Sequence, residues 1–196
     1  MNIEKLKAKL KENMTIDGVV NKRYYHSVGV AEAAASLVIK HNLSIDLDKA
    51  YVAGLLHDAT KLLPLNLQKE MLIRSGYKED DEIMKSKNVW HGETAPNYVK
   101  NVYEIDDEEI LNAIKYHVMG RPNMNDLEKV VFVADYIEKN RVGEVFDNAR
   151  KIAFMNLDDA ILYILSSQIK YITSKGEYLV SQTLKTYEYY KGEKES

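Results

Sequence analysis

The sequence predicts an all-α protein, and three observations support this prediction. Nearly every long segment repeats apolar residues at the three- to four-residue period of a helix. Only three prolines and nine glycines interrupt the 196 residues. No Asn-Gly or Asp-Gly pair lies between alternating strand patterns, since Asp17-Gly18 joins two helical patterns. Without an internal repeat or a Pro- or Ser-rich linker, residues 1–196 are expected to form one helical domain.

The helices of the N-terminal half are predicted from their apolar stripes. The first helix is amphipathic, and its apolar face consists of Ile3, Leu6, Leu10 and Met14. The second covers residues 22–41, and its stripe consists of Tyr25, Val28, Ala31, Ala35 and Val38. The third covers residues 46–57, and further helices are expected near residues 66–74 and 91–103.

The helices of the C-terminal half begin with two capping signals. Asp106 with Glu109, and Asn125 with Glu128, have the spacing of a capping box and predict helices near residues 107–117 and 125–140. The last helices are expected near residues 156–173 and 177–190. The tyrosines of the tail are interpreted as a packing surface, namely Tyr178, Tyr187, Tyr189 and Tyr190.

Composition and charge exclude several classes of protein. A net charge of −3 and a pI near 6.0 do not provide the broad basic surface of a nucleic-acid binder. The absence of cysteine excludes thiolate nucleophiles, Cys-ligated zinc and iron–sulfur clusters. The longest apolar runs, such as residues 130–134, are far shorter than the ~18 residues of a membrane span. The protein is therefore expected to be cytoplasmic, with no membrane or nucleic-acid partner; a membrane-surface role for the first helix is the less favoured alternative.

An adjacent His-Asp pair ends an apolar run in the segment AGLLHDATK, residues 53–61. Asp135 similarly interrupts the apolar segment VVFVADYI, where an unpaired carboxylate would be costly to bury. Four histidines have comparable surroundings: His26, His57, His91 and His117. Any one alone would be a satisfied core histidine, but a divalent cation accounts for all of them together. His41, at a helix end without such surroundings, is assigned to a helix-dipole contact or to solvent.

The order His26, His57-Asp58, Asp135 matches the H…HD…D pattern of the HD-domain metal-dependent phosphohydrolases. More specifically, the chain resembles the YqeK family, bacterial HD proteins that hydrolyse diadenosine tetraphosphate symmetrically to two ADP. The matching segments are RYYHSVGVAEAA (residues 23–34), AGLLHDATK, HGETA (91–95), ILNAIKYHVMGRPNM (110–124) and LEKVVFVADYIEKNR (127–141). They cover most of residues 20–145, and the C-terminal helices are expected to pack on this core. Ala59 and Lys139-Asn140 depart from the family's usual aromatic and Pro-Gly, at the expected edge of the pocket.

The resemblance implies an HD-type helical bundle with a metal site in its core. Its metal ligands would be His26, His57, Asp58 and Asp135, and the metal would be iron, with manganese or zinc as alternatives. His91 and His117 would hold a second metal or contact phosphates, so one or two ions remain open. Asp58, His91 and His117 would be the catalytic residues. In this mechanism, hydroxide on the metal attacks an inner phosphorus of the nucleotide.

Four basic residues lie close in sequence to the expected metal ligands, namely Arg23, Lys61, Arg121 and Arg141. Because guanidinium and ammonium groups bind phosphate, these residues are predicted phosphate contacts. Tyr136 either contacts a nucleoside or packs in the core. The alternatives for function are another HD phosphohydrolase, acting on a nucleoside triphosphate or cyclic nucleotide, or a non-catalytic nucleotide sensor. A homodimer remains open.

Overall fold

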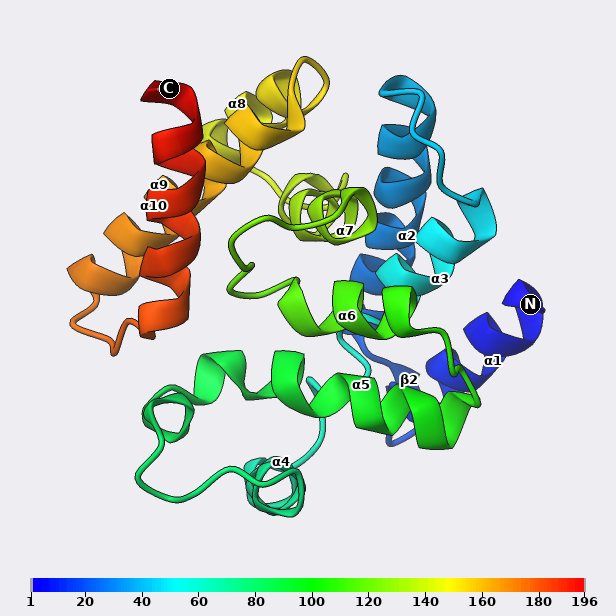
Figure 1. The fold of residues 1–196 in the computed structure, drawn as a ribbon. Coiled ribbons are helices and arrows are strands. Elements are labelled where there is room, and N and C mark those ends of the chain that lie inside the picture. Colours follow the sequence, from blue (N-terminus) through cyan, green and yellow to red (C-terminus); the bar gives the residue numbers. More distant parts are fainter. Residues whose placement is uncertain (1, 196) are drawn as a thin grey trace.

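The computed structural model describes residues 2–195, and within this range it is almost entirely helical (Figure 1). The first half contains α1 (Ile3–Asn13), β1 (Thr15–Ile16), β2 (Val19–Val20), α2 (Lys22–Lys40), α3 (Leu47–Leu56), α4 (Leu65–Arg74), η1 (Glu82–Lys85) and η2 (Lys87–Val89). The second half contains α5 (Trp90–Tyr103), α6 (Glu108–Tyr116), α7 (Asp126–Ile137), α8 (Glu144–Ala153), α9 (Leu157–Ser174) and α10 (Ser181–Glu195). The predicted all-α class is confirmed.

The helix α7 lies at the centre of the molecule (Figure 1). It packs against α2, α3 and α6 on one side and against α8 and α9 on the other, while α10 packs on α9. Residues 130–134 of α7 are all buried, which explains why this helix reads as a continuous apolar run. The capping box predicted at Asn125 and Glu128 is present at its start.

Helices α2 and α3 pack closely because residue 54 is a glycine. A Cβ atom on Gly54 would lie 2.9 Å from the Cα atom of Ala31 in α2, and backbone atoms cannot give way at that distance. His26 extends from α2 and His57 follows α3 directly. The close packing therefore brings these two imidazoles together.

The sequence analysis missed a short hairpin at Asp17-Gly18. Residues 15–16 and 19–20 pair antiparallel, and both turn residues have positive φ, 50° for Asp17 and 78° for Gly18. These values fit a two-residue Asp-Gly hairpin turn. The strands are only two residues long, too short to show an alternating pattern, so the prediction of two helices joined here without a hairpin was wrong.

Three helix details also differ from the expectations. Asp107, rather than Asp106, caps α6, with its side chain accepting from the backbone amides of Glu109 and Ile110. The predicted stripe of α2 is partly wrong, because Tyr25 is 56% exposed and the helix buries Val30, Ala34 and Leu37 instead. The helix α8 was not predicted at all.

The C-terminal tyrosines largely pack as expected. Tyr190 is buried, and Tyr187 and Tyr189 pack against the main core. Tyr178 instead donates a hydrogen bond from its hydroxyl to Glu82. Among residues 2–195, no helix combines the length and apolar character needed to cross a membrane.

Candidate metal centre

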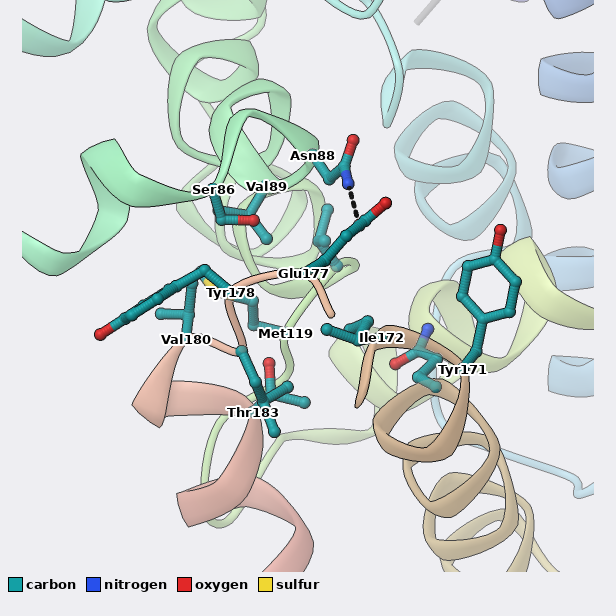
Figure 2. A pocket seen from close by; sticks show the side chains of 13 residues that line it. Ser86, Asn88, Val89, Met119, Tyr171, Ile172, Glu177, Tyr178, Val180 and Thr183 are labelled. Carbon is teal, nitrogen blue, oxygen red and sulfur yellow. Dashed lines mark hydrogen bonds between the residues drawn. The ribbon is translucent and has the colours of Figure 1, made fainter. Parts of the chain in front are cut away.

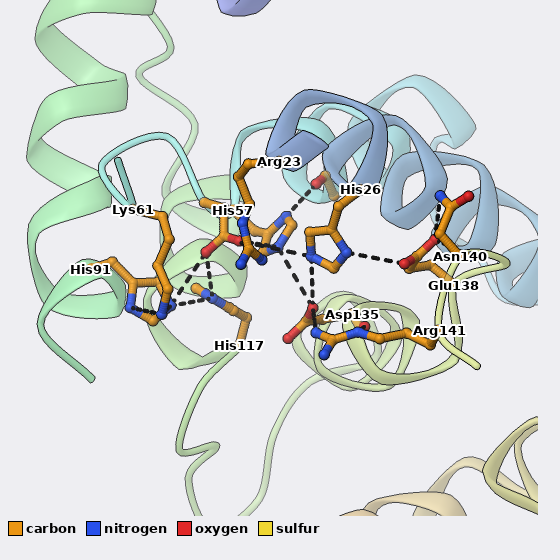
Figure 3. A network of polar contacts seen from close by, with 12 residues as sticks. Arg23, His26, His57, Lys61, His91, His117, Asp135, Glu138, Asn140 and Arg141 are labelled. Carbon is orange, nitrogen blue, oxygen red and sulfur yellow. Dashed lines mark hydrogen bonds and ion pairs between the residues drawn. The ribbon is translucent and has the colours of Figure 1, made fainter. Parts of the chain in front are cut away.

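Histidine and aspartate side chains from five helices or their ends converge at one place in the core (Figure 3). His26 extends from α2, His91 from the first turn of α5, and Asp135 from the end of α7. His57 and His117 are the residues that directly follow α3 and α6. The six predicted residues, including Asp58, are thus brought together although 109 positions separate the first from the last.

One half of the cluster surrounds the Oδ2 atom of Asp58. The Nε2 atom of His57 lies 3.4 Å from this oxygen, and that of His26 lies 3.7 Å from it. The Oδ1 atom of Asp135 completes this half, 3.0 Å from His26 Nε2 and 3.8 Å from His57 Nε2.

The other half of the cluster surrounds the second oxygen of the same carboxylate. His91 Nε2 lies 3.3 Å and His117 Nε2 lies 3.8 Å from Asp58 Oδ1. The two Nε2 atoms are 3.2 Å apart. Asp58 therefore faces a pair of histidines with each of its oxygens.

Hydrogen bonds behind the rings fix the direction of three imidazoles. The Nδ1 atoms of His57 and His117 each lie 2.6 Å from a backbone carbonyl, of Gly54 and Ile114 respectively. A carbonyl only accepts, so each Nδ1 carries the proton and each Nε2 presents its lone pair to the cluster. His26 Nδ1 lies 3.1 Å from the Glu138 carboxylate and is oriented in the same way.

The residues of the cluster fit a divalent cation. The Nε2 atoms of His26 and His57 are buried and have no hydrogen-bond partner within the described part of the chain. A buried lone pair facing carboxylate oxygens is unfavourable unless a positive charge lies between them. Imidazole nitrogen and carboxylate oxygen are together a donor set for zinc, manganese or iron. The arrangement is that of a divalent-metal site.

Burial lowers the pKa values of His91 and His117, whereas the neighbouring carboxylates raise the pKa of His57. Burial, reinforced by Lys61, holds the pKa of His91 well below its ordinary value. Burial also lowers the pKa of His117 to about 4. For His57, burial opposes the charged form, but Asp58 outweighs it and raises the pKa. The neighbouring histidines hold the pKa of Asp58 well below its usual range despite its burial.

These shifts predict that the metal-free protein loses stability as the pH falls from 7 towards 4. In that window the unfolded chain protonates His91 and His117 near pH 6.5, while the folded protein leaves them neutral, so acid favours unfolding. His117 alone would contribute about 3 kcal/mol across this window. His57 acts oppositely, because its raised pKa stabilises the folded state at low pH, but it is one group against two.

Urea unfolding at pH 7 and pH 5, with a chelator present, measures this effect. We expect a lower midpoint at pH 5 and a smaller pH dependence in His117→Gln. A midpoint that stays constant or rises at pH 5 would contradict the assignment of His91 and His117 as neutral groups.

Three of the four predicted phosphate-binding residues lie at the cluster. Arg23 Nη1 is 2.9 Å from Asp58 Oδ2, and Arg141 Nη2 is 2.9 Å from Asp135 Oδ1. Lys61 Nζ is 3.1 Å from His91 Nδ1. Arg121 instead pairs with the buried carboxylate of Glu128, at 2.9 Å, and its contact with phosphate stays a prediction.

Two cavities border the cluster, and both are lined by Arg141. One, of about 700 Å³, is lined by Asp135 and Tyr136, and the other, of about 390 Å³, by Arg23 and His26. Tyr136 is half-buried, with its ring centroid 4.9 Å from that of Phe146. Tyr136 therefore both packs against a neighbour and faces a cavity.

The sequence analysis missed Glu138, which is 2% exposed and holds His26. Its Oε2 atom accepts hydrogen bonds from the backbone amide and side-chain amide of Asn140. The sequence does contain a signal for Glu138, because this second carboxylate follows Asp135 by three residues and lies next to an apolar helix. Asn140 lies where the sequence departs from the family's Pro-Gly, and the departure supplies a partner for Glu138.

His41 lies away from this network, at the opposite end of α2 from His26. It is the C-terminal cap of α2, and its Nε2 atom is 2.7 Å from the carbonyl oxygen of Ala153. It thus has a structural contact rather than a place among the cluster residues.

Known proteins are similar to this chain in both sequence and fold. The HD domain family matches residues 23–140. A Bacillus subtilis protein named bis(5'-nucleosyl)-tetraphosphatase, symmetrical, is 33% identical over 188 residues, covering 95% of this chain and 96% of its own. A Staphylococcus aureus protein of the same name is 34% identical over 192 residues, and the match covers 97% of this chain and 95% of that protein.

A solved structure is also similar over the full length. A Clostridium acetobutylicum protein described as a predicted HD superfamily hydrolase involved in NAD metabolism superposes with a TM-score of 0.89. It is 36% identical, and the match covers 98% of both chains. The segment that matches the HD domain contains all six residues of the cluster. The chain therefore belongs to the HD-domain family.

Proposed function

We propose that this protein hydrolyses diadenosine tetraphosphate symmetrically to two ADP in a metal-dependent reaction. The observation that carries the proposal is the buried cluster, in which imidazole Nε2 atoms and carboxylate oxygens converge and the Nε2 atoms of His26 and His57 have no hydrogen-bond partner among the described residues. The near full-length similarity to two proteins named symmetrical bis(5'-nucleosyl)-tetraphosphatases supports the substrate and the position of cleavage.

The first metal ion is held by His26, His57, Asp58 and Asp135 in this proposal. Their donor atoms lie 3.0 to 3.8 Å apart across the Oδ2 half of the cluster. When bound, a divalent cation supplies Lewis-acid polarisation of a phosphoryl oxygen and an acidified water ligand. The ligand set accommodates iron, manganese and zinc alike. We propose iron because of the resemblance to the YqeK family, with manganese and zinc as alternatives.

The second half of the cluster suits a second cation rather than a direct contact with phosphate. The pKa shifts leave His91 and His117 neutral near pH 7, so they offer lone pairs and carry no positive charge to a phosphate. Asp58 turns a separate oxygen to this half and would bridge the two ions.

Lys61 opposes filling of this second position. Lys61 Nζ lies 3.1 Å from His91 Nδ1 and 3.5 Å from His91 Nε2, and an ammonium group has only donors, so the shorter contact favours Nδ1 as the acceptor. The proton of His91 then resides on Nε2, the atom that faces Asp58 and His117. A cation bound there requires His91 to move its proton to Nδ1 and Lys61 to turn away, and we propose that the second ion binds more weakly for this reason.

Lys61→Met is therefore expected to strengthen binding of the second metal ion without strengthening binding of the first. Titration of the chelator-treated protein with manganese measures both steps. We expect roughly tenfold tighter binding of the second ion, about the effect of one charge-assisted hydrogen bond. Lys5→Met, at an exposed position of α1, is the control. A single equivalent in both proteins, or an unchanged second step, would contradict the opposition by Lys61.

The basic residues of the site are proposed to bind the polyphosphate. Arg23 and Arg141 each use only part of their five N–H donors on the cluster carboxylates, and their remaining donors border the cavities. The formal charges of Arg23, Lys61 and Arg141 cancel those of Asp58, Asp135 and Glu138. A bound metal ion therefore makes the site net positive, which favours a polyanionic chain over a less charged nucleotide.

A comparison of substrates tests the proposed function. The metal-loaded protein is incubated separately with diadenosine tetraphosphate, ATP, a deoxynucleoside triphosphate and cyclic AMP, and the products are resolved by chromatography. We expect rapid loss of diadenosine tetraphosphate with ADP as the sole product. Faster turnover of one of the other nucleotides would replace this proposal with another HD phosphohydrolase activity.

A further inference from the structure

The larger cavity beside the cluster is lined by both aromatic and polar side chains. It has a volume of about 700 Å³ and begins at Asp135 and Arg141. Three rings line it, from Tyr136, Phe146 and Tyr171. This volume is in the range of small-molecule sites, and aromatic rings bind nucleobases by stacking. The cavity thus provides a surface for a base within reach of the proposed phosphate contacts.

One polar side chain in this cavity is free for a ligand. Gln168 lies on α9, half-buried, and its carboxamide has no hydrogen-bond partner among residues 2–195. Its neighbour Ser167 differs, because the Ser167 hydroxyl donates to the Tyr163 carbonyl. Gln168 therefore contributes an unused donor and an unused acceptor next to the aromatic rings.

Gln168 and Tyr171 also border a second cavity, of about 400 Å³ (Figure 2). The two residues are three positions apart on one helix and so lie side by side. Figure 2 shows Tyr171 projecting from α9 at the edge of this cavity, while Asn88 donates a hydrogen bond to Glu177 at 2.7 Å on another side. The pair thus stands at the boundary of two cavities, in a helix outside the segment that matches the HD domain.

We propose that Gln168 recognises the adenine of the nucleotide and makes the site prefer adenine over guanine. A carboxamide pairs with the N6 donor and N7 acceptor of adenine, whereas guanine presents two acceptors, O6 and N7, at the same edge. Tyr171, Tyr136 and Phe146 provide the stacking surface, which does not distinguish the bases. The inference rests on the proposed function, because it names how that site selects its substrate.

Binding of ADP and GDP to the chelator-treated protein tests this inference without turnover. Calorimetry is expected to show tighter binding of ADP by wild type, and about tenfold weaker ADP binding in Gln168→Leu with little change for GDP. Gln168→Glu is expected to weaken binding of both ADP and GDP, because a carboxylate only accepts and would face N7 of adenine or O6 and N7 of guanine at the same edge. Lys170→Ala, exposed on the same helix, is expected to behave as wild type.

The inference and the proposed function can fail separately in this design. If wild type hydrolyses diadenosine tetraphosphate but Gln168→Leu keeps the wild-type ratio of ADP to GDP affinity, the role of Gln168 is overturned and the function stands. If the ratio depends on Gln168 but no protein hydrolyses the dinucleotide with any metal, the base contact stands and the proposed function is overturned.

Discussion

Replacing Asp58 by alanine is expected to reduce hydrolysis of diadenosine tetraphosphate by at least about a thousandfold, since losing a central electrostatic group commonly has this effect. Both carboxylate oxygens of Asp58 face imidazole Nε2 atoms, so its loss removes an oxygen ligand from each half of the cluster. The remaining imidazoles would then face a cation with the charge of Asp135 alone. We therefore expect the loss of metal and the loss of activity to occur together.

Metal content and turnover of the same preparation test this expectation. His41→Ala is the matched control, because His41 caps α2 and its Nε2 atom contacts the backbone carbonyl of Ala153, away from the cluster. We expect His41→Ala to retain metal and most of its activity. Asp58→Ala with unimpaired turnover would show that the cluster is not the reaction centre.

Gly29→Ala is expected to have the second largest effect, although Gly29 is not one of the proposed ligands. A Cβ atom on Gly29 would lie 2.5 Å from Glu138 Oε2, which is too close to remain in place. The Glu138 carboxylate would have to move, and it would lose hydrogen bonds to His26 and Asn140. Because a group behind a metal-bound histidine sets its orientation, we expect metal affinity to fall about 10- to 100-fold.

Metal titration of Gly29→Ala and of a second glycine variant measures this effect. Gly192 lies in α10, and a Cβ atom added there would meet none of the described atoms within 4 Å outside its chain neighbours and its own helix backbone. Gly192→Ala should therefore keep wild-type metal affinity and be slightly more stable, since alanine favours a helix. Equal metal affinity in the two variants would contradict the proposed role of Glu138 in orienting His26.

The sequence predicted the cluster because each of its members is unusual in its own segment. A carboxylate at Asp58 or Asp135 inside an apolar run needs a partner, and that need can be inferred without a structure. The helix periods likewise predicted most of the fold, because α2, α3 and α7 each bury an apolar face. The pairing of Asp58 with two separate groups of histidines could not be inferred, since it depends on the packing of five segments.

Other features were missed or lacked a local signal. The helix α8 follows Gly143, whose φ is 129°, and buries only Ala149 and Ala153. Its apolar residues share one face, so a helical period was present in the sequence and was overlooked. Arg121 has the same local sequence features as the other basic residues, but it lies before α7 and pairs with Glu128 in the first turn of that helix. Gln168 belongs to no motif, and only the cavity gives it a function.

Hydrolysis of diadenosine tetraphosphate in oxygen-18 water tests the central claim most directly, because it locates the phosphorus that is attacked. With metal-loaded protein, we predict ADP as the sole nucleotide product, with the label on the terminal phosphate of one ADP from each cleaved molecule. The other ADP, which leaves with the bridging oxygen, should carry no label. Formation of ATP and AMP, or no product with iron, manganese or zinc, would contradict the account.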